Sequence, residues 1–166
     1  MAHLRSLRYR LEELALRTLV TSLRPLSLDK SSDLGAGLMR RIGPHLGKPS
    51  RVALDNLERV FSREEARRLL PEVWANLGRV AFEYPHLRRL AFDHDRIQIE
   101  GRENFERIKS QGKGCVFVAA HLGNWELFPD IMDRLGGHIL LIYRAPNNPY
   151  VRDLVQEIRP ETGVTY

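Results

Sequence analysis

The feature that most restricts the fold of this chain is an unbroken apolar run, CVFVAA, at residues 115–120. Six apolar residues in a row fit a β-strand that is covered on both faces, as the strands of parallel sheets are. A glycine-containing turn at residues 111–114 precedes the run, and the polar segment HLGNWE at residues 121–126 follows it. The run therefore predicts a buried strand with reactive residue types at its carboxyl end.

A second apolar run, residues 138–143, follows a predicted helix that runs to Arg134 and a Gly-Gly break at residues 136–137. Strand, helix and strand in this order form the βαβ unit of an α/β domain. Residues 96–100 alternate polar and apolar side chains, which is typical of a half-buried strand. We therefore expect residues 95–166 to form the first part of an α/β domain, with a partial mixed or parallel sheet and flanking helices.

Residues 1–94 follow a helical pattern instead. Leucines spaced three or four residues apart, with arginines between them, predict an amphipathic helix that ends near Pro25. These leucines are Leu4, Leu7, Leu11 and Leu14. Further on, Ser62 and Glu65 form the pattern of a capping box at the start of a helix that runs to about residue 84. This part of the chain is expected to be helical and to associate with membranes.

Charge is distributed unevenly along the chain. Residues 1–60 hold 11 Lys+Arg and 6 Asp+Glu, whereas basic and acidic residues are equal in number in residues 61–166. Charge alone fits an anionic partner and a merely solvated face equally well. Because the basic segment also carries an apolar stripe, an anionic membrane surface is favoured as partner over a helix whose leucines simply pack on the rest of the domain. Nucleic acid is disfavoured because no recognised binding module accompanies the charge. The longest charge-free run, residues 114–125, is too short for a membrane span, which needs about 20 apolar residues.

His121 and Glu126 are the candidate catalytic pair. They cannot share one face of a continuous helix, because five residues correspond to about 500° of rotation. They can meet if His121 lies in a turn and Glu126 in the first turn of the next helix, with Asn124 as N-cap. A carboxylate bound to one imidazole nitrogen fixes the tautomer, and the other nitrogen then accepts a proton from a hydroxyl nucleophile. The pattern predicts general-base catalysis.

Metal and thiol chemistry are disfavoured. A zinc site of this type needs a second nearby histidine, and the next one, His138, lies beyond a Gly-Gly break. Cys115 begins the apolar run and is expected to be buried and inert. We therefore expect neither a metal nor another cofactor.

Other polar residues extend the candidate site. A guanidinium at Arg144 is suited to binding a phosphate or an oxyanion, although a surface ion pair explains it equally well. Trp125 fits an acyl pocket or the protein core. The candidate substrate-binding residues are Asn124, Trp125, Tyr143, Arg144 and Asn148.

Two segments, HLGNWE at residues 121–126 and YRAPNNP at residues 143–149, resemble the bacterial lipid A biosynthesis lauroyl/myristoyl acyltransferases. This family belongs to the lysophospholipid acyltransferase-like superfamily. Similarity to its helical region lies at residues 54–57, 60–61, 76–80 and 83–87. The matching segments follow the order of the family, which makes the resemblance more specific than a His-x4-Glu pattern alone.

The resemblance implies transfer of an acyl chain from acyl carrier protein to a hydroxyl of a lipid A precursor, at the cytoplasmic face of the bacterial inner membrane. His121 would be the general base and Glu126 its partner, without an acyl-enzyme. Arg144 and Asn148 would bind phosphate or the oxyanion. Attachment to the membrane is expected to be peripheral or monotopic.

Family members are longer than this chain and carry further strands. The resemblance therefore implies the N-terminal part of a glycerolipid acyltransferase-like fold. A non-catalytic fragment that binds a membrane surface or a partner is the alternative that the sequence leaves open.

Overall fold

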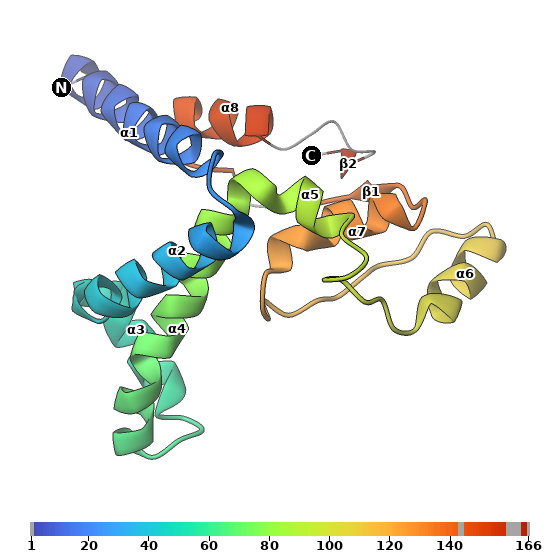
Figure 1. Ribbon diagram of the computed structural model, residues 1–166, viewed down its shortest axis with the longest axis horizontal. Helices are drawn as coiled ribbons and strands as arrows, with labels where there is room; N and C mark the ends of the chain where they lie inside the picture. The colour runs from blue at the N-terminus through green and yellow to red at the C-terminus, as the bar shows by residue number, and fades with distance from the viewer. Residues whose placement is uncertain (1, 143–144, 159–163, 166) are drawn as a thin grey trace. The chain divides into compact units, whose positions relative to one another are not determined.

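The computed structural model describes residues 2–142, 145–158 and 164–165 of the chain (Figure 1). The α-helices are α1 (Ala2–Leu23), α2 (Leu28–Ile42), α3 (Gly47–Leu57), α4 (Arg63–Glu83), α5 (Leu87–Ala91), α6 (Arg102–Ser110), α7 (Phe128–Arg134) and α8 (Pro149–Ile158). Three 3-10 turns, η1 (Gly43–His45), η2 (Tyr84–His86) and η3 (Trp125–Leu127), and two strands, β1 (Ile139–Leu140) and β2 (Val164–Thr165), complete the described elements.

The chain divides into two compact units. The helical unit comprises Thr18–Pro85, and the site unit comprises Met1–Arg17 together with His86–Tyr166. The boundary therefore falls within α1. The predicted division into residues 1–94 and 95–166 stays a prediction.

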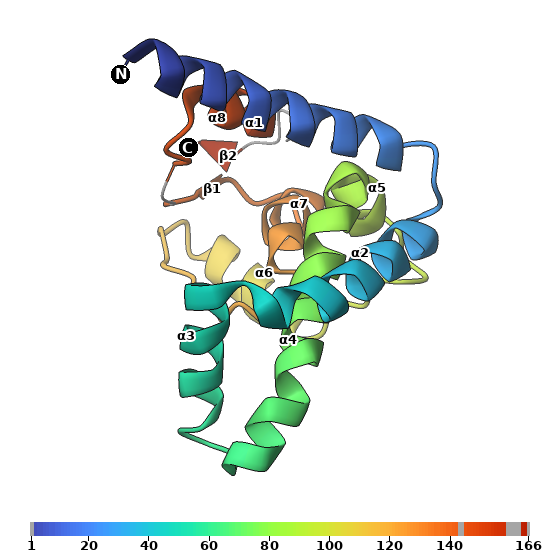
Figure 2. The ribbon, with the colours of Figure 1, turned by 90° about the vertical axis from the view of Figure 1, so that its left-hand side faces the viewer.

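The helical unit is organised around the crossing of α2 and α4 (Figure 2). Gly35 of α2 and Gly78 of α4 face each other so closely that a Cβ on either would overlap the carbonyl oxygen of the other. The two helices are also joined by Arg40, whose guanidinium donates to both carboxylate oxygens of Glu72 at 2.9 and 2.6 Å. Small residues at the crossing allow the backbones to approach, because no side chain separates them.

Two consecutive hydrogen bonds lie in the core of the helical unit. The buried Trp74 donates its indole N–H to Ser50 Oγ at 3.0 Å, and the Ser50 hydroxyl donates to the Gly43 carbonyl at 2.5 Å. The indole ring also leaves no room for a Cβ at Gly43. This arrangement ties α3, α4 and η1 together and satisfies polar groups that have been removed from water.

The predicted capping box at the start of α4 is confirmed. Glu65 N–H donates to Ser62 Oγ at 3.3 Å, and Ser62 N–H donates to Glu65 Oε2 at 3.1 Å. The Ser62 hydroxyl also donates to that carboxylate, and this bond lowers the pKa of Glu65 from its ordinary value. The box satisfies two backbone donors that a helix start leaves without intrahelical partners.

In the site unit, α8 lies alongside α1, as Figures 1 and 2 both show. Arg17 of α1 donates to both carboxylate oxygens of Glu157 in α8, at 3.2 and 3.0 Å. The bonds to Glu157 and to Glu13 raise the pKa of Arg17 above its ordinary value. The Arg10 guanidinium lies over the Tyr150 ring, 5.4 Å from its centroid. The polar face of α1 is thus the face that contacts α8.

The predicted α/β fold is wrong. The run at residues 115–120 forms no strand, and Val116 and Val118 are 89% and 93% exposed. Residues 97–100 also lack strand structure. In the described part of the chain, the strand pairing consists of Ile139 with Val164 and Leu140 with Thr165, in parallel. The described residues are predominantly helical and contain no sheet of the predicted kind.

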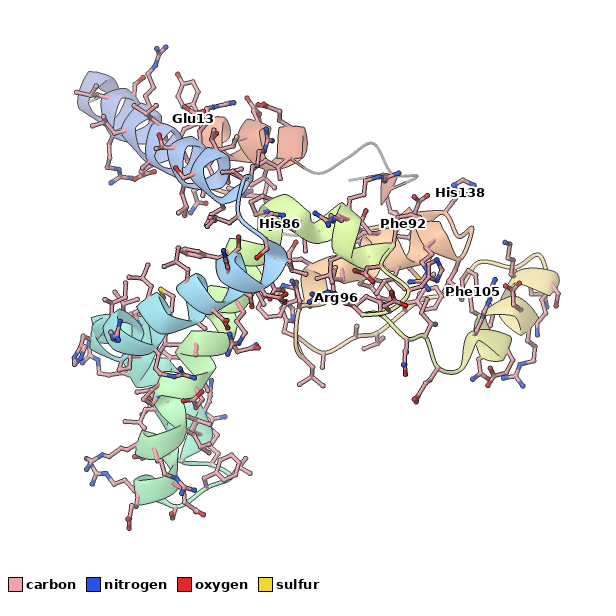
Figure 3. All side chains as sticks on the ribbon, viewed as in Figure 1. Glu13, His86, Phe92, Arg96, Phe105 and His138 are labelled. Atoms are coloured by element: carbon pink, nitrogen blue, oxygen red, sulfur yellow. The ribbon has the colours of Figure 1, made fainter. Side chains whose placement is uncertain are left out.

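The physical reason is that a central strand needs partners on both edges for its backbone N–H and C=O groups. Among the described residues, the run at 115–120 pairs with no strand, and the run at 138–143 pairs with β2 on one edge only, at Ile139 and Leu140. Within the segment 113–120, Phe117 contacts two helices of the site unit. Its ring lies 6.4 Å from Phe105 of α6, labelled in Figure 3, and 5.9 Å from Phe128 of α7.

Candidate functional site

The candidate site lies where the irregular segment 113–124 enters η3 and α7. Gly123 adopts a positive φ of 55°, a conformation that other residues rarely reach. Asn124 then caps η3, and its side-chain oxygen accepts from Glu126 N–H at 3.2 Å. The structure therefore confirms the predicted turn, with Asn124 as N-cap and Glu126 in the first helical turn.

Trp125 contacts both members of the candidate catalytic pair. Its ring centroid lies 4.9 Å from that of His121, with an angle of 53° between the planes. Its indole N–H donates to Glu126 Oε1 at 3.2 Å. The three side chains therefore form one group, with His121 exposed and the other two half-buried.

The chemistry of this group follows from its residue types. A neutral imidazole has one nitrogen that accepts a proton and one that donates. Because His121 is exposed, a hydroxyl substrate can reach it from solvent. The arrangement is suited to general-base catalysis.

The scaffold beneath the site is the contact between α5 and α7. Arg134 of α7 donates to the Ala91 carbonyl at 3.0 Å and lies 2.7 Å from His94 Nδ1. Leu127 and Met132 are buried in the same region. These contacts fix α7, which follows η3 directly.

Tyr143 and Arg144 lie outside the described residues. Their predicted substrate-binding roles therefore stay predictions.

Asn148 is buried and makes contacts within the protein. Its amide group donates to the Tyr9 carbonyl at 2.8 Å and to Glu12 Oε2 at 2.9 Å. Its oxygen accepts from the backbone N–H of Tyr150 at 3.0 Å and of Val151 at 3.4 Å, in the manner of an N-cap. Sequence reasoning missed this role, although Asn before Pro149 at a helix start is a recognisable cap signal. The substrate-binding role of Asn148 stays a prediction.

Cys115 is exposed, contrary to the prediction of a buried thiol. The reason is again that the apolar run forms no covered strand. Among the described residues, no group of three or more His, Cys, Asp or Glu side chains is arranged to hold a metal ion.

Comparison with known proteins assigns the family. The family described as bacterial lipid A biosynthesis acyltransferase matches residues 1–165, a range that contains both motif segments and the group around His121. Neither a search among curated proteins nor one among solved structures found a match. The match confirms the resemblance predicted from the motifs and implies acyltransferase activity in lipid A biosynthesis. The chain therefore belongs to the bacterial lipid A biosynthesis acyltransferase family.

Proposed function

We propose that the chain transfers a fatty acyl group from acyl carrier protein to a hydroxyl of a lipid A precursor, with His121 as general base and Glu126 as its partner. The observation that carries this proposal is the group of His121, Trp125 and Glu126 within the range matched by the family. Family membership supports acyl transfer in lipid A biosynthesis. The identity of the donor, the acceptor and the base belongs to the proposal.

The proposed reaction needs no acyl-enzyme. The unprotonated ring nitrogen of His121 takes the proton of the acceptor hydroxyl. At the same time, the hydroxyl oxygen attacks the thioester carbonyl. A C–O bond forms and the C–S bond breaks. The imidazolium then returns the proton to the departing thiolate. Glu126 stabilises the imidazolium between these two steps, as a carboxylate partner does in other histidine-dependent enzymes.

Arg144, Asn148 and Tyr143 complete the proposal as substrate-binding residues. The proposal for Arg144 is supported by its guanidinium, which matches the geometry of phosphate groups and developing oxyanions. For Asn148 the substrate role competes with its observed bonds to α1 and α8. The variant Arg144→Gln is expected to raise KM for the lipid acceptor or to lower kcat, whereas unchanged kinetics would remove Arg144 from the site.

The catalytic assignment is tested by acyl transfer from acyl carrier protein to a lipid A precursor. General-base catalysis contributes about 10²- to 10⁴-fold to a rate, so His121→Ala is expected to lose activity on that scale. Glu126→Gln keeps the shape of the side chain but removes its charge. This variant is expected to lose less activity than His121→Ala. Equal activity in the wild type and both variants would contradict the assigned base.

We further propose that the chain attaches peripherally to an anionic membrane surface, at the cytoplasmic face of the inner membrane, through α1. None of the helices in the described part of the chain combines the length and apolarity that crossing a bilayer requires. The outward leucines of α1 are about half exposed: Leu7 at 53%, Leu11 at 58% and Leu14 at 56%. With about 100° per residue, they lie within one narrow stripe.

Charge on α1 supports the same proposal. Arg8 and Arg10 are exposed and flank the leucine stripe. Glu12 accepts a bond from Asn148 and also pairs with Arg8 at 3.1 Å, and Glu13 accepts a bond from Arg17. The exposed stripe is therefore bordered by two arginines, of which Arg8 is paired with a carboxylate and Arg10 lies over the Tyr150 ring. An apolar stripe with basic borders is typical of helices that lie in the membrane interface.

Vesicle flotation tests this attachment. The wild type is expected to float with vesicles that contain phosphatidylglycerol and to bind less when the salt concentration rises. Replacing Leu7, Leu11 and Leu14 by Gln is expected to abolish flotation, whereas Val60→Gln, at an exposed apolar position of the helical unit, serves as the matched control. Flotation that survives the triple substitution would contradict the role of α1.

The non-catalytic alternative is tested by the same two assays. Binding to vesicles without any acyl transfer by the wild type would favour it over the enzyme.

A further inference from the structure

We propose that Trp125 is a positioning residue that holds His121 and Glu126 in their mutual orientation. The inference rests on the proposed function, because it assigns these two residues as base and partner. It differs from the sequence-based hypotheses, in which Trp125 lines an acyl pocket or packs in the core.

The geometry makes Trp125 the link between the two residues. Aromatic rings with centroids 4.5–7 Å apart attract each other, and the 4.9 Å between His121 and Trp125 lies in this range. An indole has a single N–H donor, and here that donor is bonded to Glu126 Oε1. One rigid side chain therefore contacts the imidazole with its ring and the carboxylate with its N–H.

His121 needs such a partner because its backbone is weakly supported. Residues 111–123 are all exposed, and the segment that carries His121 belongs to no helix or strand. Trp125 instead lies in η3, which Asn124 caps and which the buried Leu127 fixes to the protein. The ring contact thus connects a side chain on an irregular segment to a rigid element.

The contact also suits the chemistry. When His121 takes up a proton it becomes a cation, and an aromatic face attracts cations through its quadrupole. The Trp125 N–H meanwhile orients the carboxylate that partners the base. Both interactions act on the imidazolium state, so loss of Trp125 is expected to lower kcat more than substrate affinity.

Kinetics of Trp125→Leu and Trp125→Phe distinguish the positioning role of Trp125 from a role in an acyl pocket. Trp125→Leu is expected to lower kcat roughly 10- to 100-fold, on the scale of misplacing a catalytic group. KM for the acyl donor is expected to stay within about twofold, because ground-state binding is not the interaction removed. Trp125→Phe keeps a ring but loses the N–H, so its kcat is expected to lie between those of the wild type and Trp125→Leu. A raised KM with unchanged kcat would overturn the proposal in favour of an acyl pocket.

Nuclear magnetic resonance gives a readout that does not require activity. The ring protons of His121 lie close to the indole and are expected to shift in Trp125→Leu, because the ring current is lost. Leu122→Ala, at the exposed position next to His121, is the matched control and is expected to leave these protons unshifted. Unshifted His121 signals in Trp125→Leu would overturn the positioning role. An inactive wild type would contradict the proposed function, and the resonance experiment alone would then decide the role of Trp125.

Discussion

The helical unit and the segment 113–124 of the site unit differ in what holds their backbone. In the helical unit, glycines at a helix crossing, a capping box and a buried indole fix the helices. The segment 113–124 belongs to no helix or strand, and the described ring contacts hold it through Phe117 and His121. The helices satisfy their own backbone groups, whereas an extended segment depends on a neighbour for them. Substitutions should therefore lower the free energy of unfolding strongly in the helical unit and only slightly in the segment 113–124.

The largest effect is expected at the crossing of α2 and α4. Gly78→Leu places a side chain against the Gly35 carbonyl and Met39, so the helices must separate. We expect a loss of at least about 3 kcal/mol in the free energy of unfolding of the helical unit, measured by urea denaturation. Gly37→Ala, where a Cβ meets nothing within 4 Å, is the control and is expected to stabilise the unit slightly. Equal stability of both variants would contradict the close crossing.

The next effect is expected in the buried chain around Trp74. Ser50→Ala leaves the buried indole N–H without the partner that now satisfies it. It also removes one of two bonds to the Gly43 carbonyl, which still accepts from Leu46 N–H at 2.9 Å. A buried polar group without a partner costs about 1–3 kcal/mol, and we expect a loss in that range by urea denaturation. A loss below the error of the measurement would show that water replaces the hydroxyl.

A smaller effect is expected at the start of α4. Ser62→Ala removes the capping box and is expected to lower the free energy of unfolding by about 1 kcal/mol. The bond from Ser62 lowers the pKa of Glu65 below its ordinary value of 4.5, so the charged form of Glu65 stabilises the folded state. This contribution is present above pH 4.5 and is lost as the pH falls through the lowered pKa. The difference between wild type and Ser62→Ala should therefore shrink in acid, and a constant difference would contradict the box.

The smallest effect is expected at the exposed valines of the segment 113–124. Val116→Ser and Val118→Ser are each expected to change the free energy of unfolding by less than about 0.5 kcal/mol, as exposed substitutions do. Phe117→Ala should lower the free energy of unfolding more than either valine substitution, because the Phe117 ring packs against Phe105 and Phe128. Losses of several kcal/mol at the two valines would instead indicate the covered strand that the sequence predicts.

Sequence reasoning succeeded where the signal is local. The capping box of Ser62 and Glu65 and the cap at Asn124 each involve residues within three positions of each other, and both are present. The group around His121 likewise lies within six residues, and the motif that contains it predicted the family.

Sequence reasoning failed where the outcome depends on distant partners. Residues 115–120 have the composition of a buried strand, but a strand forms only beside another, and no strand among the described residues pairs with this segment. The same reasoning missed the bonds of Asn148 to α1 and the approach of Gly35 to Gly78, because these partners lie far apart in the chain. The exposed thiol of Cys115 follows from the missing strand.

The most direct test of the proposed function is single-turnover acyl transfer by wild type, His121→Ala and His45→Ala. His45 is an exposed histidine of the helical unit and controls for the loss of an imidazole elsewhere. We expect His45→Ala to match the wild type and His121→Ala to be about 10²- to 10⁴-fold slower. Equal rates for wild type and His121→Ala would contradict His121 as the base.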